Sequence, residues 1–268
     1  MANIGSIVTN HVPDRIVSKT NVFTQSECSD LIIKAEARGF KPSAPSGGGH
    51  GQHPNTGART SQFLVTEDDM LAKKLWTLMN DIVPKDLHSI KPVPYMNSFT
   101  KGDEWTPIGV NPHIRYYKYD KGQYVLKHDD YRMSRYRYSE GENKWYQQMS
   151  FLTILVYLNE EFSGGNTAFW TKYATPDAPS SHCRYLREVE FESADLIIPP
   201  QTGKVLLQDH VVQHEGEEVT KGTKYIIRTD VLHEKEVSPE RIQEKFKKGQ
   251  VFGEWSKHYE PSCLNYTE

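Results

Sequence analysis

Residues 204–232 read KVLLQDHVVQHEGEEVTKGTKYIIRTDVL and indicate the fold class of the chain. The runs KVLLQD and KYIIRTDVL are of strand length, and a polar stretch with a glycine turn near Gly222 separates them. We therefore expect His214 and Lys224 to lie on neighbouring strands joined through this turn. The stretch predicts a β-sheet core.

From residue 112 onward the chain shows further runs of strand length separated by turn signals. They are HIRYYKY at 113–119, SFLTILVYL at 150–158, TAFW at 167–170 and EVEF at 188–191. Six or more short strands predict a barrel or a jelly roll. We expect a mostly β protein with flanking helices, of the α+β class, with its β core over about residues 112–234.

Helices are expected on either side of this core. Thr24 and Glu27 stand at capping-box spacing before a periodic run, which predicts a helix over 25–38 closed by Gly39. A second amphipathic run covers 67–83, and Pro239 follows Ser238 as the first residue of a C-terminal helix. We predict helical support over about 20–85, a C-terminal helix and tail over about 238–268, and a single domain over 1–268.

Composition sets limits on partners and location. The net charge of -3, from 32 basic and 35 acidic residues, favours neither nucleic acid nor an anionic membrane as a partner. The three cysteines are widely spaced and odd in number, so we expect reduced thiols and no zinc knuckle. No signal peptide or membrane-spanning run is visible. Provided that Met1 is the true start, we predict a cytoplasmic protein.

One long loop is expected inside the domain. Residues 41–58 read KPSAPSGGGHGQHPNTGA and show no periodicity. Loops of this length often cover active sites. The loop and Arg59, which follows it, are therefore our candidates for a lid.

Three residues have the pattern of a metal site. His128 and Asp130 lie two apart in KHDDYR, so on a strand they project to the same side while Asp129 points away. His214 supplies a second histidine, and His210 is its main rival. Two histidines and one carboxylate leave three coordination positions open, which suits Fe(II) that binds a bidentate cosubstrate and then oxygen. This ligand set indicates an oxygenase.

Two cations follow the second histidine. Lys224 and Arg228 lie four apart, hence on one face of a strand. Two cations inside a small barrel are costly unless they meet an anion. This spacing favours an anionic ligand inside the barrel; the alternative is that both side chains face solvent.

From about Val22 to Glu234 the sequence resembles the Fe(II)- and 2-oxoglutarate-dependent dioxygenases, and among them the prolyl 4-hydroxylase-like branch. The resemblance rests on five motifs in the right order. They are VFTQSECSDLI, the triplet Arg59-Thr60-Ser61, YYKYDKGQYVLKHDD, LVYLNEEFSGGNTAFW and QHEGEEVTKGTKYIIRTD. It implies a double-stranded β-helix core of the cupin-like, jelly-roll type.

The resemblance also implies roles for individual residues. His128, Asp130 and His214 would hold the iron. Lys224, at the ten-residue offset of the prolyl 4-hydroxylases, would pair with the distal carboxylate of 2-oxoglutarate. Tyr119 resembles a tyrosine that lines the cosubstrate pocket. Tyr157 is similar to one that donates its hydroxyl to the same carboxylate, and Thr153 lies on the face of Tyr157. The alternative is that these three are ordinary strand residues.

The implied cofactors are Fe(II), 2-oxoglutarate and O2, with ascorbate as a further candidate, and the implied reaction is hydroxylation of proline in a peptide or protein. Arg228 departs from the pattern expected of a peptidyl prolyl hydroxylase, and it could engage the cosubstrate or an anionic substrate. The segment 130–148, which contains Arg132, is rich in arginine and tyrosine and is a candidate substrate contact. Two alternatives stay open: a dioxygenase acting on a free amino acid or other small molecule, and a non-catalytic module that binds metal or ligand.

Overall fold

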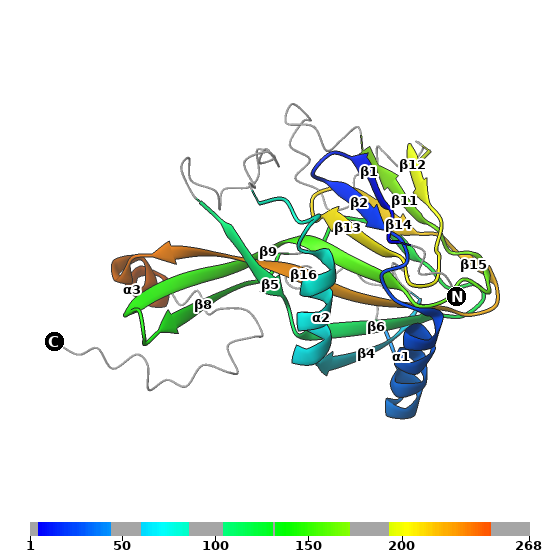
Figure 1. Cartoon of the computed structure of the whole chain (residues 1–268), viewed down its shortest axis with the longest axis horizontal. Coiled ribbons are helices and arrows are strands. Elements are labelled where there is room, and N and C mark those ends of the chain that lie inside the picture. Colours follow the sequence, from blue (N-terminus) through cyan, green and yellow to red (C-terminus); the bar gives the residue numbers. More distant parts are fainter. Residues whose placement is uncertain (1–4, 44–59, 86–103, 131, 172–192, 248–268) are drawn as a thin grey trace.

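The structure, a computed structural model, describes residues 5–43, 60–85, 104–130, 132–171 and 193–247 (Figure 1). Its helices are α1 (Gln25–Arg38), α2 (Asp69–Met79) and α3 (Pro239–Lys247). Its strands are β1 (Val8–Val12), β2 (Ile16–Lys19), β3 (Lys41–Pro42), β4 (Gln62–Glu67), β5 (Thr106–Val110), β6 (His113–Tyr119), β7 (Val125–His128), β8 (Ser134–Ser139), β9 (Lys144–Tyr157), β10 (Ser163–Gly164), β11 (Thr167–Trp170), β12 (Leu196–Ile198), β13 (Val205–Asp209), β14 (Gln213–Gly216), β15 (Val219–Lys221) and β16 (Lys224–Val237). None of the described helices is long and apolar enough to cross a membrane.

Two antiparallel sheets form the core. The larger sheet has the order β1-β2-β13-β9-β16-β6-β4-β3, with β5 added to β16 and β8 added to β9, and the smaller sheet has the order β12-β11-β14-β7. Apolar side chains of both sheets share one buried cluster, in which Phe169 and Ile198 of the smaller sheet join Leu206 and Ile226 of the larger one. Two facing antiparallel sheets of this kind confirm the predicted jelly-roll, double-stranded β-helix core.

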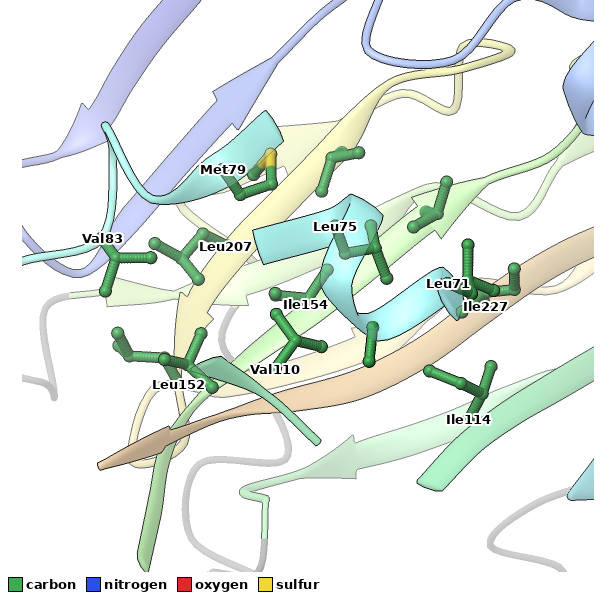
Figure 2. Packing of buried hydrophobic residues seen from close by; sticks show 14 of the residues in the cluster. Leu71, Leu75, Met79, Val83, Val110, Ile114, Leu152, Ile154, Leu207 and Ile227 are labelled. Atoms are coloured by element: carbon green, nitrogen blue, oxygen red, sulfur yellow. The ribbon is translucent and has the colours of Figure 1, made fainter. Parts of the chain in front are cut away.

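Helices cover the outer face of the larger sheet. Figure 2 shows the apolar face of α2, with Leu71, Leu75 and Met79, against side chains of the sheet such as Ile154 and Leu207. All five residues are buried and belong to the largest apolar cluster of the described chain. The spacing of four between the α2 residues places them on one helix face, as the sequence pattern predicted. The sheet is thereby held rigid from behind, while its inner face is left to the site.

The predicted helix ends are also confirmed. Thr24 caps α1 and forms a capping box with Glu27, and Gly39, with φ of +83°, follows its last residue. Such a left-handed position favours glycine, which carries no Cβ. Helix α3 begins at Pro239, again as predicted.

The structure places His214 and Lys224 differently from the prediction. His214 lies on β14 in the smaller sheet, whereas Lys224 begins β16 in the larger sheet. The two residues therefore face each other across the core and do not lie on neighbouring strands. The chain crosses between the sheets through β15 and the turn at Gly222, whose φ is +80°. A turn-based pattern predicts a hairpin, but the pairing of β15 with β10 carries the chain to the other sheet.

The β structure also begins earlier than predicted. Strands β1 and β2 form a hairpin that joins the sheet at β13, and β4 pairs with β6, although β structure was expected only from residue 112. The run VTNHV of β1 is polar and mostly exposed, so local patterning gives no strand signal. These strands form because they pair with strands that are distant in the sequence. The run EVEF at 188–191 and most of the loop at 41–58 lie outside the described residues, and Lys41–Pro42 form β3.

Candidate functional site

The three predicted ligand residues meet between the two sheets. His128 ends β7 and is the direct cross-strand partner of His214 on β14, with ring centroids 4.4 Å apart. Asp130 follows β7 by two residues, and its Oδ1 and Oδ2 lie 3.8 Å from His128 Nε2 and 3.7 Å from His214 Nε2. One ligand atom from each residue lies within 4.8 Å of the others. This arrangement has the dimensions of a metal site with three protein ligands.

Hydrogen bonds at the far side of each ring turn both histidines toward Asp130. Nδ1 of His128 lies 2.7 Å from the carbonyl oxygen of Leu126, and Nδ1 of His214 lies 2.9 Å from that of Val212. A carbonyl only accepts, so each Nδ1 carries the proton and each Nε2 presents its lone pair. Burial also lowers the pKa of His214, which favours the neutral imidazole that binds metals.

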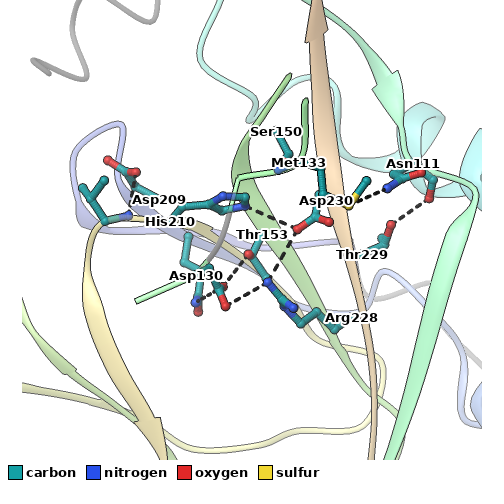
Figure 3. Close-up of polar contacts among 12 residues, drawn as sticks. Asn111, Asp130, Met133, Ser150, Thr153, Asp209, His210, Arg228, Thr229 and Asp230 are labelled. Atoms are coloured by element: carbon teal, nitrogen blue, oxygen red, sulfur yellow. Dashed lines mark hydrogen bonds and ion pairs between the residues drawn. The ribbon is translucent and has the colours of Figure 1, made fainter. Parts of the chain in front are cut away.

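Side chains around Asp130 hold its carboxylate in place (Figure 3). The Thr153 hydroxyl donates to Oδ2 at 2.6 Å, and the Gln208 amide lies 3.4 Å from the same oxygen. Arg228 donates to Oδ1 at 2.8 Å. Burial alone would raise the pKa of Asp130, but Arg228 and the neighbouring histidines together outweigh it and hold that pKa well below its usual range. Asp130 is therefore ionised and oriented.

Gln208 is a site residue that the sequence did not single out. It lies on β13, and its Nε2 is 2.9 Å from Nε2 of His214, the atom that would bind a metal. It stands two residues before His210 in the run VLLQD, and no motif marks it. Only the pairing of β13 with β9, which sets Gln208 opposite Thr153, brings it to Asp130.

Lys224 lies at the other end of the same pocket, and among the described residues only the more distant Glu217 carboxylate acts on its charge. It is 4% exposed, and its Nζ donates to the carbonyl oxygen of Gly165. The rings of Tyr119 and Tyr157 lie 5.5 and 5.8 Å from Nζ. Among the described residues no carboxylate reaches Nζ at ion-pair distance. Burial lowers the pKa of Lys224 to about 8, and the charge of Glu217, which acts in the opposite direction, does not compensate for it.

One pocket connects the two ends. Its walls come from both sheets and combine the metal-ligand candidates, two cations and apolar side chains: Tyr117, Tyr119, Val125, His128, Asp130, Leu155, Thr167, His214, Glu215, Gly216, Lys224, Ile226 and Arg228. Tyr157 reaches this pocket through Thr167, whose Oγ1 is 2.7 Å from the Tyr157 hydroxyl. Thr153 is placed at the metal end, against Asp130, and not beside Lys224.

Two arginines of the predicted site have different positions. Arg228 lines the pocket, and the anions it contacts are Asp130 and, at 3.7 Å, Asp230. Arg132 lies over the Phe151 ring, 5.4 Å from its centroid, outside the pocket lining. Arg59 lies outside the described residues.

The pocket fits an iron ion and a dianionic cosubstrate. Three converging ligands leave three positions of an octahedral ion open, and this ligand set is typical of non-haem Fe(II) oxygenases. A buried, unpaired lysine at the far end of the pocket matches one carboxylate of an elongated dicarboxylate. The His210 alternative is not supported by the geometry, because its ring faces Asp230, with Nε2 3.3 Å from Oδ1, and not His128.

Comparison with known proteins agrees with this chemistry. Residues 114–229 match the family model of the 2OG-Fe(II) oxygenase superfamily, and the matched segment contains His128, Asp130, His214 and Lys224. The matched segment is similar to that superfamily, and together with the jelly-roll core and the His-Asp-His group it indicates an Fe(II)- and 2-oxoglutarate-dependent dioxygenase. A search of curated protein sequences finds no match.

Similar solved structures are distant. The viral collagen prolyl hydroxylase of Paramecium Bursaria Chlorella virus-1 is 16% identical, with a TM-score of 0.46 over 82% of this chain and 96% of that one. A prolyl-4-hydroxylase of Pseudomonas putida is 11% identical, with a TM-score of 0.48 over 81% of this chain and 91% of that one. A prolyl hydroxylase of Trichoplax adhaerens, solved with a hypoxia inducible factor peptide, is 13% identical, with a TM-score of 0.47 over 81% of this chain and 83% of that one.

Proposed function

We propose that the protein hydroxylates proline in a peptide or protein, with conversion of 2-oxoglutarate to succinate and CO2. In this proposal His128, Asp130 and His214 hold Fe(II), and Lys224 binds the distal carboxylate of 2-oxoglutarate. One observation carries it: two Nε2 atoms and a carboxylate converge at one end of a pocket whose other end holds a buried lysine without an anion. When bound, iron and 2-oxoglutarate supply the oxidant for C–H hydroxylation.

The protein's own residues contribute orientation and a dry environment. The Leu126 and Val212 carbonyls hold the proton of each ring on Nδ1, so the Nε2 atoms of both histidines keep the lone pair that binds a metal. Thr153 and Arg228 fix the rotation of the Asp130 carboxylate. Apolar side chains of the pocket wall, Val125, Leu155 and Ile226, exclude water, which protects a reactive oxidant from side reactions.

The proline assignment rests on the sequence motifs. Lys224 follows His214 by ten residues, the offset that resembles the prolyl 4-hydroxylases. A dioxygenase that acts on a free amino acid or another small molecule would use the same iron end of the pocket. The two alternatives therefore differ in the substrate and not in the oxidant, and a substrate experiment separates them.

The iron site is tested by Fe(II)-dependent release of succinate from 2-oxoglutarate. We expect His128→Ala and Asp130→Ala to abolish it, because each removes one of three ligands. Asp129→Asn is the matched control, since it removes the neighbouring carboxylate charge, and it should retain activity. If native protein releases no succinate even in the presence of candidate substrates, the enzyme proposal fails and a non-catalytic ligand-binding module takes its place. If Asp130→Ala releases as much succinate as native protein, Asp130 is not a metal ligand.

The substrate class is tested by mass spectrometry. Native protein and His128→Ala are incubated in parallel with proline-rich peptides and with a panel of free amino acids and small acids. We expect a gain of one oxygen on prolyl peptides with native protein alone. Oxygen added only to a small molecule would replace the proline assignment by the small-molecule alternative.

A further inference from the structure

The buried polar groups behind Asp130 form a closed ring. Arg228 contacts Asp130 Oδ1 at 2.8 Å and Asp230 Oδ1 at 3.7 Å. Asp230 Oδ1 in turn lies 3.3 Å from Nε2 of His210. The main-chain carbonyl of His210 closes the ring, because it accepts the N–H of Asp130 at 2.8 Å. Figure 3 shows the side chains of this ring pointing toward one another.

We propose that Arg228, Asp230 and His210 act as positioning residues that fix Asp130, both at its backbone and at its carboxylate, for metal binding. The inference rests on the proposed iron site and deepens it. It also explains two residues that have no role in the metal triad. Arg228 is a cation that was not expected at this position. His210 is close in sequence to the ligand His214, but its ring does not point toward the three ligand side chains.

Rigid strands hold the ring. Arg228 and Asp230 lie two apart on β16, so their side chains share one face, and β16 pairs with β9 along most of its length. Asp230 stands directly opposite Thr153, which donates to the other oxygen of Asp130. The carbonyl oxygen of Asp230 also accepts the N–H of Asn111 at 2.9 Å. Both carboxylate oxygens of Asp130 are therefore held by side chains of β16 and β9.

Burial makes these contacts matter. His210 and Asp230 are 0% and 1% exposed, so neither has water to replace a lost partner. His210 Nε2 lies 3.3 Å from Asp230 Oδ1, so the ring and the carboxylate are in direct polar contact. Arg228 is the member that reaches both carboxylates, since a guanidinium presents several donors in one plane.

The charges of the ring also suit its ligands. Asp130 and Asp230 carry two negative charges, and Arg228 and Lys224 carry two positive ones. A divalent metal and a dianionic cosubstrate add charges that cancel each other. These four side chains and the two ligands then sum to zero charge, which limits the cost of burying them. Glu215 also lines the pocket, and burial raises the pKa of its carboxyl group.

Alternative roles for Arg228 give opposite results. If Arg228 contributed only its charge, its removal would strengthen binding of a divalent cation, because a nearby positive charge would be lost. If Arg228 bound a substrate anion, its removal would leave metal affinity unchanged. A positioning role alone predicts weaker metal binding, since Asp130 is then free to turn away.

The test uses Co(II) as the metal, with binding and coordination followed by its visible absorption in the full-length protein. We expect Arg228→Ala to weaken Co(II) binding on the order of tenfold and to change the shape of the absorption band, with a smaller effect in the same direction for Asp230→Asn. The double variant should resemble Arg228→Ala, because both changes break one ring. Added guanidinium ion at a concentration well below denaturing should restore the band of Arg228→Ala.

The matched control is Arg137→Ala. Arg137 lies on β8 and forms a two-pronged contact with Glu234 on the outer part of β16, at 3.1 and 2.9 Å, away from the pocket. It should leave Co(II) affinity unchanged. If Arg228→Ala does not fold, Arg228→Lys tests the same proposal, because a lysine keeps the charge but does not span both carboxylates. Arg228→Lys should also weaken Co(II) binding.

The outcomes separate the two proposals. Native protein that binds no Co(II) contradicts the proposed metal site itself. Native protein that binds Co(II), with equal or tighter binding in Arg228→Ala and in Asp230→Asn, overturns the positioning ring and leaves the metal site intact. Additive effects of the two changes would likewise show that Arg228 and Asp230 act separately.

Discussion

Arg228 and Lys224 are cations on the same face of one strand, Lys224 buried and Arg228 half-buried, and their surroundings differ. Arg228 contacts two carboxylates of the protein, Asp130 and Asp230. Lys224 donates to a single carbonyl, that of Gly165, and lies between tyrosine rings. Removal of one partner of an ion pair inside the protein leaves an uncompensated charge, whereas a buried cation without an ion-pair partner already carries that cost. Arg228 is therefore part of the ion-pair network of the protein itself, whereas Lys224 is available to bind an anionic ligand.

This difference revises the expectation that both cations meet an anionic ligand. The anion at Arg228 is Asp130, one of the proposed metal ligands, so this cation is already neutralised within the protein. Lys224 alone keeps its capacity for an incoming carboxylate. Arg228 therefore gives no reason to favour an anionic substrate, and the substrate has to be identified through other parts of the pocket.

The largest effect is expected from Lys224→Met on 2-oxoglutarate binding. Loss of one partner of a buried ion pair costs about 3–5 kcal/mol, which is roughly two to four orders of magnitude in affinity. Titration calorimetry of 2-oxoglutarate into Co(II)-loaded protein measures it. Lys221→Met, an exposed lysine three residues earlier, is the control and should bind normally. Unchanged affinity in Lys224→Met would show that the cosubstrate carboxylate binds elsewhere.

The second effect is on stability and has opposite signs at the two cations. Arg228→Met leaves the carboxylates of Asp130 and Asp230 buried without their cation, so we expect a loss of about 3 kcal/mol in the free energy of unfolding. Lys224→Met removes an unpaired buried charge and should be neutral or stabilising. Urea denaturation of both variants without metal and cosubstrate compares them. A loss of equal size in both would contradict the distinction between a paired and an unpaired cation.

The third effect is a pH dependence that only the unpaired cation produces. The pKa of Lys224 is lowered to about 8 by burial, so the side chain loses its charge above that pH. The affinity for 2-oxoglutarate should therefore fall about tenfold for each pH unit above about 8. Without cosubstrate the sign is reversed: between pH 8 and the higher pKa of the unfolded chain, the unfolded state binds more protons, so stability rises with pH.

Calorimetry between about pH 7 and pH 9 checks this dependence, with Lys224→Arg as the control. Arginine stays charged throughout this range, so the variant should lose the pH dependence even where its affinity is lower. Persistence of the same pH profile in Lys224→Arg would assign the titration to another group.

Local signals were sufficient for the helices and for the three metal-ligand candidates. The Thr24 and Glu27 capping box, the spacing along 67–83 and Pro239 each mark a helix by contacts within a few residues, and the structure has all three helices. The grouping of His128, Asp130 and His214 was likewise predicted, since strand alternation and the two-residue spacing select Asp130 over Asp129.

Features that depend on distant pairing could not be predicted in this way. Strand β1 has a polar sequence, and β2, with which it forms a hairpin, joins the sheet only because β13 offers an edge. Gln208 becomes a neighbour of Asp130 through the register of β13 with β9. The ion-pair partners of Arg228 could not be predicted either, because the contact depends on how the folded chain places Asp130 and Asp230 around one guanidinium group.

The smallest effect concerns the tyrosine beside the unpaired cation. The Tyr157 hydroxyl forms a hydrogen bond with Thr167 Oγ1, and Thr167 lines the pocket. We therefore expect Tyr157 to orient the Thr167 hydroxyl toward the cosubstrate carboxylate near Lys224. Loss of one such hydrogen bond costs about 1 kcal/mol, so Tyr157→Phe should raise the KM for 2-oxoglutarate by about fivefold without a change in kcat. Tyr225→Phe is the control, since the Tyr225 hydroxyl is bonded to Glu36 outside the pocket. The same fivefold rise in Thr167→Val and in the double variant would place both hydroxyls in one contact with the cosubstrate, whereas unchanged kinetics in Tyr157→Phe would make Tyr157 an ordinary strand residue.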